Sequence, residues 1–243
     1  MAFLPTTVKE LEERGWEYVD VIFVSGDAYV DHPSFGCAVI CRYLERAGYR
    51  VAVLAQPNWQ DDLRDFKKMG QPRLCFCVSS GCMDSMVNHY TAAKRKRSDD
   101  AYTAGGQSGF RPDRATSVYS EILKRLYPSV PVLIGGIEAS MRRLAHYDYW
   151  SDTLMPSILL TSGADMLIYG MGEKVVKRIC DELKAGRKIE EITEIEQTAY
   201  LCHKPDEAKK AWADVFVPSF EQCRRDKKSQ AKSICFFEKH SNK

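Results

Sequence analysis

Alternation of short apolar runs with amphipathic stretches is the feature of this sequence that most restricts its fold. The β-branched run at 19–26 ends in glycine, and the segment 35–48 then repeats apolar residues at helical spacing. Four further runs have the character of buried strands, at 50–56, 73–81, 131–136 and 165–169. Three further segments have helical spacing, at 61–70, 113–128 and 173–186. Strands that alternate with helices are joined by right-handed crossovers and form a mostly parallel sheet.

The predicted fold is therefore an α/β domain on a doubly wound, mostly parallel, five-stranded sheet of the flavodoxin-like type. We place this domain at 19–187, after a lead-in at 1–18. A polar stretch near 91–112 is longer than an ordinary connection, which predicts an insertion. After residue 187 the apolar residues lose their period, so 188–243 is predicted to be a connector.

Composition narrows the class of protein. Hydrophobic residues make up 44% of the 243 residues and charged residues 28%, which is average for a soluble globular protein. A net charge of +2 gives no reason to expect a nucleic-acid or membrane partner. No apolar run approaches the roughly 20 residues that span a bilayer, and no signal peptide is recognisable, so we expect a cytoplasmic protein.

The nine cysteines are predicted to be reduced and to act as small apolar residues. Cys37 and Cys41 share a helix face, and Cys75 and Cys77 share a strand face, but neither pair has the second pair that structural zinc needs. We therefore predict no metal ligand in this chain. Motifs of nucleophilic hydrolases, P-loop proteins and dinucleotide-binding proteins are missing, so no catalytic residue is predicted either.

The residues after each predicted strand are the candidates for a ligand site, because ligands of doubly wound folds bind outside the carboxyl ends of the strands. Glycine recurs there, and its missing Cβ lets a flat group lie against the backbone. Glycine is also common in ordinary turns, so a single glycine pair would not identify a ligand site. Several such loops at one edge favour a shared site, for which we nominate Ser79, Ser80, Gly135, Gly136, Glu138, Gly170, Gly172 and Glu173.

Three polar segments admit more than one interpretation. The basic run 94–97 is followed directly by aspartates, which favours a solvated loop over a phosphate site. Arg111 and Arg114 flank a helix start, where cations oppose the helix dipole, so they are candidates to pair with a carboxylate or an anionic ligand. The segment 146–152, "HYDYWSD", is equally consistent with an exposed rim for a ligand or partner and with a buried polar cluster.

Several segments together resemble the N-terminal part of the YgiQ-type radical SAM proteins. The resemblance covers about Pro5 to Lys232 and rests on "GGIEASMRRLAHYDYWSD", "ADMLIYGMGE", "KRKRSDDAYT", "RPDRAT" and "VPSFEQCRRDKK". It implies a domain similar to cobalamin-binding domains, followed by a radical SAM barrel. The barrel of this family carries Cys-x-x-x-Cys-x-x-Cys, whose thiolates hold a 4Fe-4S cluster that binds S-adenosylmethionine.

The chain departs from this family pattern at the cluster motif. Cys37 and Cys41 have the spacing of the first two cysteines in that motif, but Leu44 occupies the position of the third cysteine. We therefore expect an accessory domain that performs no radical chemistry alone, with the radical SAM barrel in cis as its partner. The alternatives are a stand-alone binding module for a corrinoid or nucleotide-like ligand, and a protein-docking domain.

Cobalamin is a further cofactor that the resemblance implies. In cobalamin-binding domains a glycine pair after the fourth strand and a serine after the third strand contact the nucleotide tail. Gly135 and Gly136 stand in the place of the pair, and Ser79 or Ser80 in the place of the serine. The same fold would also serve without cobalamin, as a docking or gating domain.

The histidine that binds cobalt in such domains has no equivalent at the expected position. The family motif is Asp-x-His-x-x-Gly, whereas this chain reads Asp31-His32-Pro33, so His32 stands one residue early. Capping of the following helix by Asp31 or Ser34 is favoured over metal ligation by His32. Cobalamin would then bind with its lower face free of any protein ligand.

Overall fold

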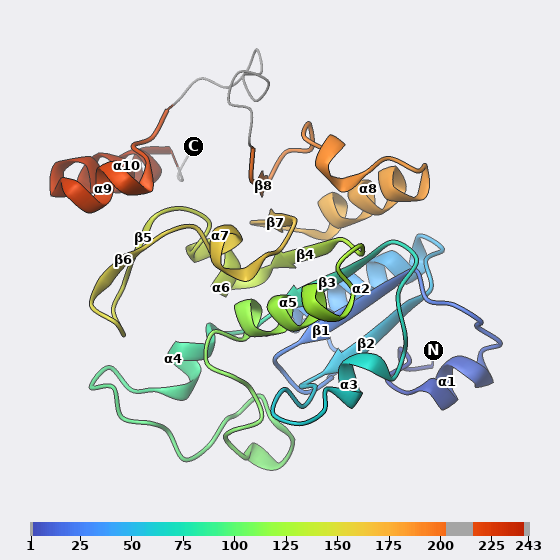
Figure 1. Cartoon of the computed structure of the whole chain (residues 1–243). Helices are drawn as coiled ribbons and strands as arrows, with labels where there is room; N and C mark the ends of the chain where they lie inside the picture. Colours follow the sequence, from blue (N-terminus) through green and yellow to red (C-terminus); the bar gives the residue numbers. More distant parts are fainter. Residues whose placement is uncertain (1, 203–215, 241–243) are drawn as a thin grey trace.

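The computed structural model describes residues 2–202 and 216–240, and it contains one central sheet flanked by helices (Figure 1). Six strands pair in the order β2-β1-β3-β4-β7-β8. In that order their bounds are Val51–Ala55, Val21–Ser25, Cys75–Ser79, Val132–Gly135, Met166–Ile168 and Thr198–Tyr200. The first five are parallel, and β8 runs antiparallel to β7. The predicted doubly wound, mostly parallel sheet is confirmed.

Helices cover both faces of the sheet. On one face α2 (Gly36–Arg46) packs beside α8 (Glu173–Lys184), and on the other α5 (Ala115–Leu126) packs beside α7 (Ile158–Ser162). Four shorter helices complete the main domain: α1 (Val8–Glu13), α3 (Arg64–Lys67), α4 (Ser85–His89) and α6 (Gly136–Met141). Within the two described stretches, no helix combines the length and the apolar character needed to cross a bilayer.

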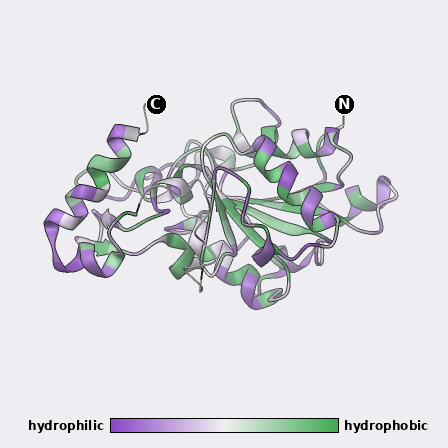
Figure 2. Cartoon of the chain, turned by 90° about the horizontal axis from the view of Figure 1, so that it is seen from above, coloured by the Kyte–Doolittle hydropathy of each residue, from purple (hydrophilic) through white to green (hydrophobic). Residues whose placement is uncertain are grey.

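The core lies in two layers because successive side chains of a strand point to opposite faces of the sheet. In β1, Val21 and Phe23 join the cluster under α2 and α8, whereas Ile22 and Val24 join the cluster under α5. Each such side chain contributes about 1.5–3 kcal/mol when fully buried. Burial on both faces explains why the strands appear in the sequence as continuous apolar runs. Figure 2 shows these strands in green, between helices that carry both purple and green residues.

The sheet has one strand more than the five predicted. Strand β8 lies in the segment 188–243, which was expected to be a connector only. Before it, Ile189, Ile192 and Ile195 are buried in the core beside α8. Three isoleucines at spacings of three and a three-residue strand are too short to produce a recognisable period, which is why the sequence pattern missed them. Further along, α9 (Phe220–Arg225) and α10 (Lys227–His240) form a helical pair.

The segment near 91–112, for which an insertion was predicted, packs against a second small sheet. It contains one 3₁₀ turn (Ala104–Gly106) and short antiparallel bridges, and it follows α4 (Figure 1). The second sheet is a hairpin of β5 (His146–Asp148) and β6 (Thr153–Met155). Insertion and hairpin therefore lie together beyond the carboxyl edge of the main sheet.

Candidate functional site

A cavity of about 340 Å³ opens at the carboxyl edge of the sheet. Strands β1, β3, β4 and β7 contribute its floor, and the first turns of α2 and α8 contribute its walls. From β1 the chain passes to β2 on one side and then crosses to β3 on the other. Doubly wound folds bind ligands at such a switch in strand order, and the cavity includes this place.

The structure brings most of the nominated residues to this cavity. Its lining includes Ser79, Gly135, Gly136, Gly170, Gly172 and Glu173. Ser80 and Glu138 do not line it. The hydroxyl of Ser80 donates to the Met83 carbonyl, and the Glu138 carboxylate accepts from Ser85 and from the Thr116 N–H. Both side chains are fully buried, so they hold neighbouring loops in place and do not face the cavity.

Gly136 is the residue whose missing side chain shapes the cavity most clearly. Its backbone has φ +81°, a conformation that glycine adopts without strain. A Cβ at this position would also lie 2.6 Å from the Ser79 Oγ. Glycine is therefore required at Gly136 both by the turn into α6 and by the close approach of the β3 and β4 ends.

The cavity is mainly apolar. Phe23, Ile40 and Ile168 lie around it, and Glu173 at the start of α8 is the charged residue of its lining. A lining without a cationic side chain does not favour a bound phosphate. The arrangement suits a flat, uncharged group that lies on the glycine backbone.

A second, more polar cavity of about 260 Å³ adjoins the first. The two share Ser34, Gly36, Ser79 and Gly136 in their linings, so they form one cleft with two parts. The polar part also contains Asp27 and the two thiols of Cys37 and Cys82. A ligand that filled both parts would need an apolar ring at one end and hydrogen-bonding groups at the other.

A buried arginine fixes the loops around the polar part. The guanidinium of Arg111, fully shielded from solvent, lies 2.9 Å from Asp27 and 3.1 Å from Asp100. It also donates a 2.7 Å hydrogen bond to the Ser80 carbonyl. The sequence left open whether Arg111 pairs with a carboxylate or an anionic ligand, and it pairs with two carboxylates. The insertion is thus anchored to the ends of β1 and β3.

The two carboxylates of this cluster respond differently to their surroundings. Burial raises the pKa of Asp27, and the nearby Arg111 only partly opposes that effect. For Asp100, burial is outweighed by the backbone N–H of Tyr102 and by Arg111, so its pKa is lowered. Asp27 also accepts a 2.7 Å hydrogen bond from the Cys82 backbone N–H. This bond holds the loop after β3 against the loop after β1.

The loop before α2 differs from the sequence-based expectation. Asp31 pairs with Arg42, whose Nε lies 3.1 Å from both carboxylate oxygens. Helix α2 begins after Phe35, which provides no side-chain cap, so the predicted capping by Asp31 or Ser34 is wrong. A charged pair is a stronger alternative for Asp31 than a cap. His32 accepts from the Ser34 N–H and lines neither part of the cleft.

The segment 146–152 combines the two interpretations that the sequence left open. Asp148 is buried and accepts from Arg114 at 2.7 Å, which accounts for the second arginine. Tyr147 and Tyr149, in contrast, are about half exposed, at 53% and 49%. One face of the hairpin is therefore a satisfied polar cluster and the other is an aromatic surface.

Several of the cysteines lie in the core. Cys41, Cys75 and Cys77 are buried free thiols between the sheet and its helices. Among residues 2–202 and 216–240, no three His, Cys, Asp or Glu side chains are gathered as metal ligands would be.

Comparison with solved structures gives distant similarities. A radical S-adenosylmethionine methyltransferase, TsrM from Kitasatospora setae with tryptophan substrate and a SAM analog bound, matches at 18% identity and a TM-score of 0.48. The match covers 75% of this chain and 28% of TsrM. A second TsrM structure, with cobalamin and a [4Fe-4S] cluster bound, matches at a TM-score of 0.47.

Comparison with known sequences gives much closer similarities. UPF0313 proteins of Bacteroides thetaiotaomicron and Porphyromonas gingivalis are each 55% identical over 99% of this chain, and one of Clostridium botulinum (strain Kyoto / Type A2) is 49% identical. The chain spans 40%, 38% and 37% of the length of these relatives. The family described as "Radical SAM N-terminal" matches residues 3–243. The chain therefore belongs to the Radical SAM N-terminal family, as the resemblance of its sequence segments predicted.

Proposed function

We propose that this chain is the ligand-holding accessory domain of a longer radical SAM protein. A radical SAM barrel in cis, with a 4Fe-4S cluster and S-adenosylmethionine, would carry the chemistry, and this chain would not react alone. The proposal is supported by family membership and by relatives of which the chain spans 40% or less. It is also supported by the absence of Cys-x-x-x-Cys-x-x-Cys from the sequence.

The observation that carries the ligand-holding role is the glycine-lined cavity at the switch in strand order. Its apolar, uncharged floor suits the heterocyclic base of a corrinoid tail. Ser79, Gly135 and Gly136 would hold that base, and the polar part of the cleft would take the groups attached to it. Because His32 lines neither part, the cobalt would receive no ligand from this histidine.

The ligand assignment is tested by equilibrium dialysis against hydroxocobalamin. Gly172 has φ −78°, and a Cβ there would only make ordinary contacts at 3.4 Å with Ile168 and 3.7 Å with Ile40. Gly172→Leu therefore fills the cavity without backbone strain, and Gly172→Ala is the matched control. We expect Gly172→Leu to weaken binding at least about tenfold, or roughly 1.4 kcal/mol, and Gly172→Ala to change it little. Absence of binding by the unmodified chain would reject the corrinoid.

The location of the cluster is tested by anaerobic reconstitution with iron and sulfide. This chain is compared with the full-length UPF0313 protein of Bacteroides thetaiotaomicron, of which it matches 40% of the length. Because cysteine thiolates hold such clusters, we expect bound iron, and the visible absorbance of an iron–sulfur cluster, only in the whole relative. Stoichiometric iron–sulfur content in this chain would contradict the assignment of the cluster to a further domain.

A second candidate function, protein docking, is favoured by the exposed apolar side chains beside the cavity. Ile137, Met141 and Met171 all remain exposed at this edge, Met171 to 74%. If no ligand binds, this surface would instead contact the remainder of the protein. Met171→Asp should then weaken association of this chain with the separately expressed remainder of the Bacteroides thetaiotaomicron relative. Unchanged association would exclude this function for the cavity edge.

A further inference from the structure

The insertion and the β5–β6 hairpin form one continuous basic and aromatic surface, which we call the insertion–hairpin face. We define it as Tyr90, residues 94–97, Tyr147, Tyr149 and Trp150. The Tyr149 hydroxyl donates to the Ala92 carbonyl at 2.8 Å, and the Lys94 ammonium donates to the Trp150 carbonyl at 3.1 Å. The basic run and the aromatic segment, more than fifty residues apart in sequence, are therefore held together.

The basic run is solvent-exposed, as the sequence favoured, and its backbone forms an ordered turn. The Thr91 N–H donates to the Arg95 carbonyl, and the Arg97 N–H donates to the His89 carbonyl. Lys94 has φ +58°, an unfavourable conformation for a residue with a side chain. Its ammonium lies 4.8 Å from the centre of the Tyr149 ring, which helps to fix it. Such strain persists where the surroundings fix the backbone, and it is common at binding sites.

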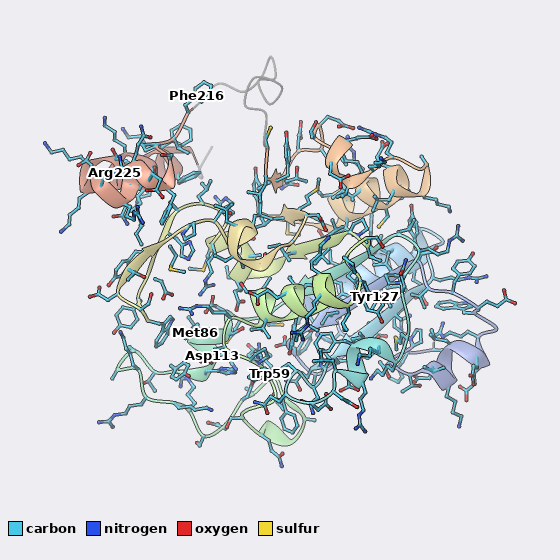
Figure 3. The ribbon with its side chains drawn as sticks, viewed as in Figure 1. Trp59, Met86, Asp113, Tyr127, Phe216 and Arg225 are labelled. Atoms are coloured by element: carbon cyan, nitrogen blue, oxygen red, sulfur yellow. The ribbon has the colours of Figure 1, made fainter. Side chains whose placement is uncertain are left out.

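Three cations of this face are available to a partner. Arg95, Lys96 and Arg97 are exposed, and their side chains form no ion pair with any residue in the described part of the chain. The nearby carboxylate of Asp113, labelled in Figure 3, is occupied by His89 at 2.7 Å and by the Tyr90 hydroxyl at 2.8 Å. These three side chains therefore present positive charge to solvent, and the exposed Asp99 follows them in the sequence.

The aromatic part of the face offers ring surfaces for stacking. Tyr147 lies in β5, and Tyr149 is the first residue of the turn that follows it. Each is about half exposed. The Trp150 ring lies 5.2 Å from that of Tyr90 and 5.4 Å from that of Tyr149, so the rings support one another.

We propose that the insertion–hairpin face binds single-stranded RNA. Arg95, Lys96 and Arg97 would contact phosphates, and the bases would stack on Tyr147 and Tyr149. The small net charge of +2 argued against such a partner. Net charge is a sum over the whole chain, however, and it does not report the cations that are gathered on this face. The proposal does not depend on the ligand of the cavity.

The geometry favours a single strand of RNA over other polyanions. A two-stranded ribbon with half-exposed rings can stack on unpaired bases, which are hidden inside a duplex. An acidic peptide would use the cations but would leave the tyrosine faces without a partner. The exposed hydroxyls of Ser151 and Thr153, 2.8 Å apart, follow Trp150 in the sequence. Ser151 donates to Asp148, so its oxygen would accept from a 2′-hydroxyl group.

The test is fluorescence anisotropy of the whole chain with a fluorescein-labelled, mixed-sequence RNA of about 16 nucleotides. The binding variant carries Arg95→Ala, Lys96→Ala and Arg97→Ala. Its charge-matched control carries Lys9→Ala, Lys67→Ala and Lys174→Ala, which are exposed on α1, α3 and α8 at the other side of the molecule (Figure 1). We expect the binding variant alone to lose about tenfold or more in affinity, and its slope of log K against log salt to fall by about 2.

Stacking is tested separately at Tyr147. Tyr147→Leu should weaken RNA binding about fivefold or more, whereas Tyr147→Phe, which keeps the ring, should bind like the unmodified chain. Thermal melting of each variant confirms that the fold is retained. Equal losses of RNA affinity in the two triple variants would overturn the proposal. Equal RNA binding by Tyr147→Leu and Tyr147→Phe would also overturn it, as would poly-glutamate that competes as strongly as unlabelled RNA. DNA of the same sequence binding as tightly as RNA would overturn the assignment to RNA.

Discussion

At the scale of single residues, Arg111 decides how the loops beside the cleft are arranged. It connects Asp27 after β1, Ser80 after β3 and Asp100 in the insertion. The sequence marked Arg111 as a cation in an unfavourable place, but it gave no means of choosing its partners. Ion-pair partners separated by 84 residues, as Arg111 and Asp27 are, depend on the tertiary fold and have no local pattern.

Replacing Arg111 by methionine should be strongly destabilising. The change leaves the buried carboxylates of Asp27 and Asp100 without their cation, which typically costs about 3–5 kcal/mol. Urea unfolding at neutral pH measures the loss. Adding Asp27→Asn and Asp100→Asn to the same variant should restore much of it. Arg64→Met, which removes an arginine from an exposed pair, is the control and should leave the free energy of unfolding nearly unchanged.

We expect His146 to make the stability of the chain depend on pH. Burial, assisted by the positive charge of Arg142, lowers the pKa of His146 below its ordinary value. A depressed pKa in the folded state means that the stabilisation is present above the unfolded-state value of about 6.5 and is lost as the pH falls below it. We expect the free energy of unfolding to fall more steeply between about pH 6.5 and 5 in the unmodified chain than in His146→Asn. Parallel curves for the two proteins would show that His146 is not responsible.

At the scale of elements, length determines what the sequence could predict. The helical pattern at 113–128 corresponds to α5 (Ala115–Leu126), and the pattern at 173–186 corresponds to α8 (Glu173–Lys184). Each has several turns, so its apolar face repeats often enough to be recognised. Strand β8 has three residues, and it is a strand because β7 offers it an edge with which to pair. Its own sequence does not specify that pairing.

The segment before β8 should matter to stability as much as a core helix does. Ile192 is fully buried beside α8, so Ile192→Ala should cost about 2–5 kcal/mol through lost burial and the cavity left behind. Ile234 on α10 is about half exposed, and Ile234→Ala is the matched control, with an expected change within about 0.5 kcal/mol. Chemical denaturation of both variants gives the comparison. A loss at Ile192 no greater than that at Ile234 would mean that residues 189–200 are not part of the folding unit.

At the scale of the whole molecule, topology explains how far the site could be predicted. Parallel strands joined by right-handed crossovers end at one edge, so the loops after β3, β4 and β7 had to meet there. That reasoning placed Ser79, Gly135 and Gly172 correctly around one cavity. It could not tell that Ser80 and Glu138 turn away, because the choice depends on hydrogen bonds made with other loops. What the cavity binds stays a prediction.

A ligand in this cavity should stabilise the whole domain, because the lining comes from four strands and three helices. When the free ligand concentration is one hundred times the dissociation constant, we expect the free energy of unfolding to increase by about 2.7 kcal/mol. Thermal melting of the unmodified chain and of Gly172→Leu, with and without hydroxocobalamin, gives the measurement. The melting temperature should rise only for the unmodified chain. A similar rise in both would place the ligand elsewhere.

The reversed direction of β8 separates its carboxyl end from the cleft. Thr198 pairs with Ile168 and Tyr200 with Met166, so β8 leaves the sheet at the edge opposite the cavity. Yet the guanidinium of Arg143 lies between the rings of Tyr169, just after β7, and Phe237, near the end of α10. Arg143 thus connects α10 with the carboxyl end of β7, on the side of the sheet at which the cleft opens.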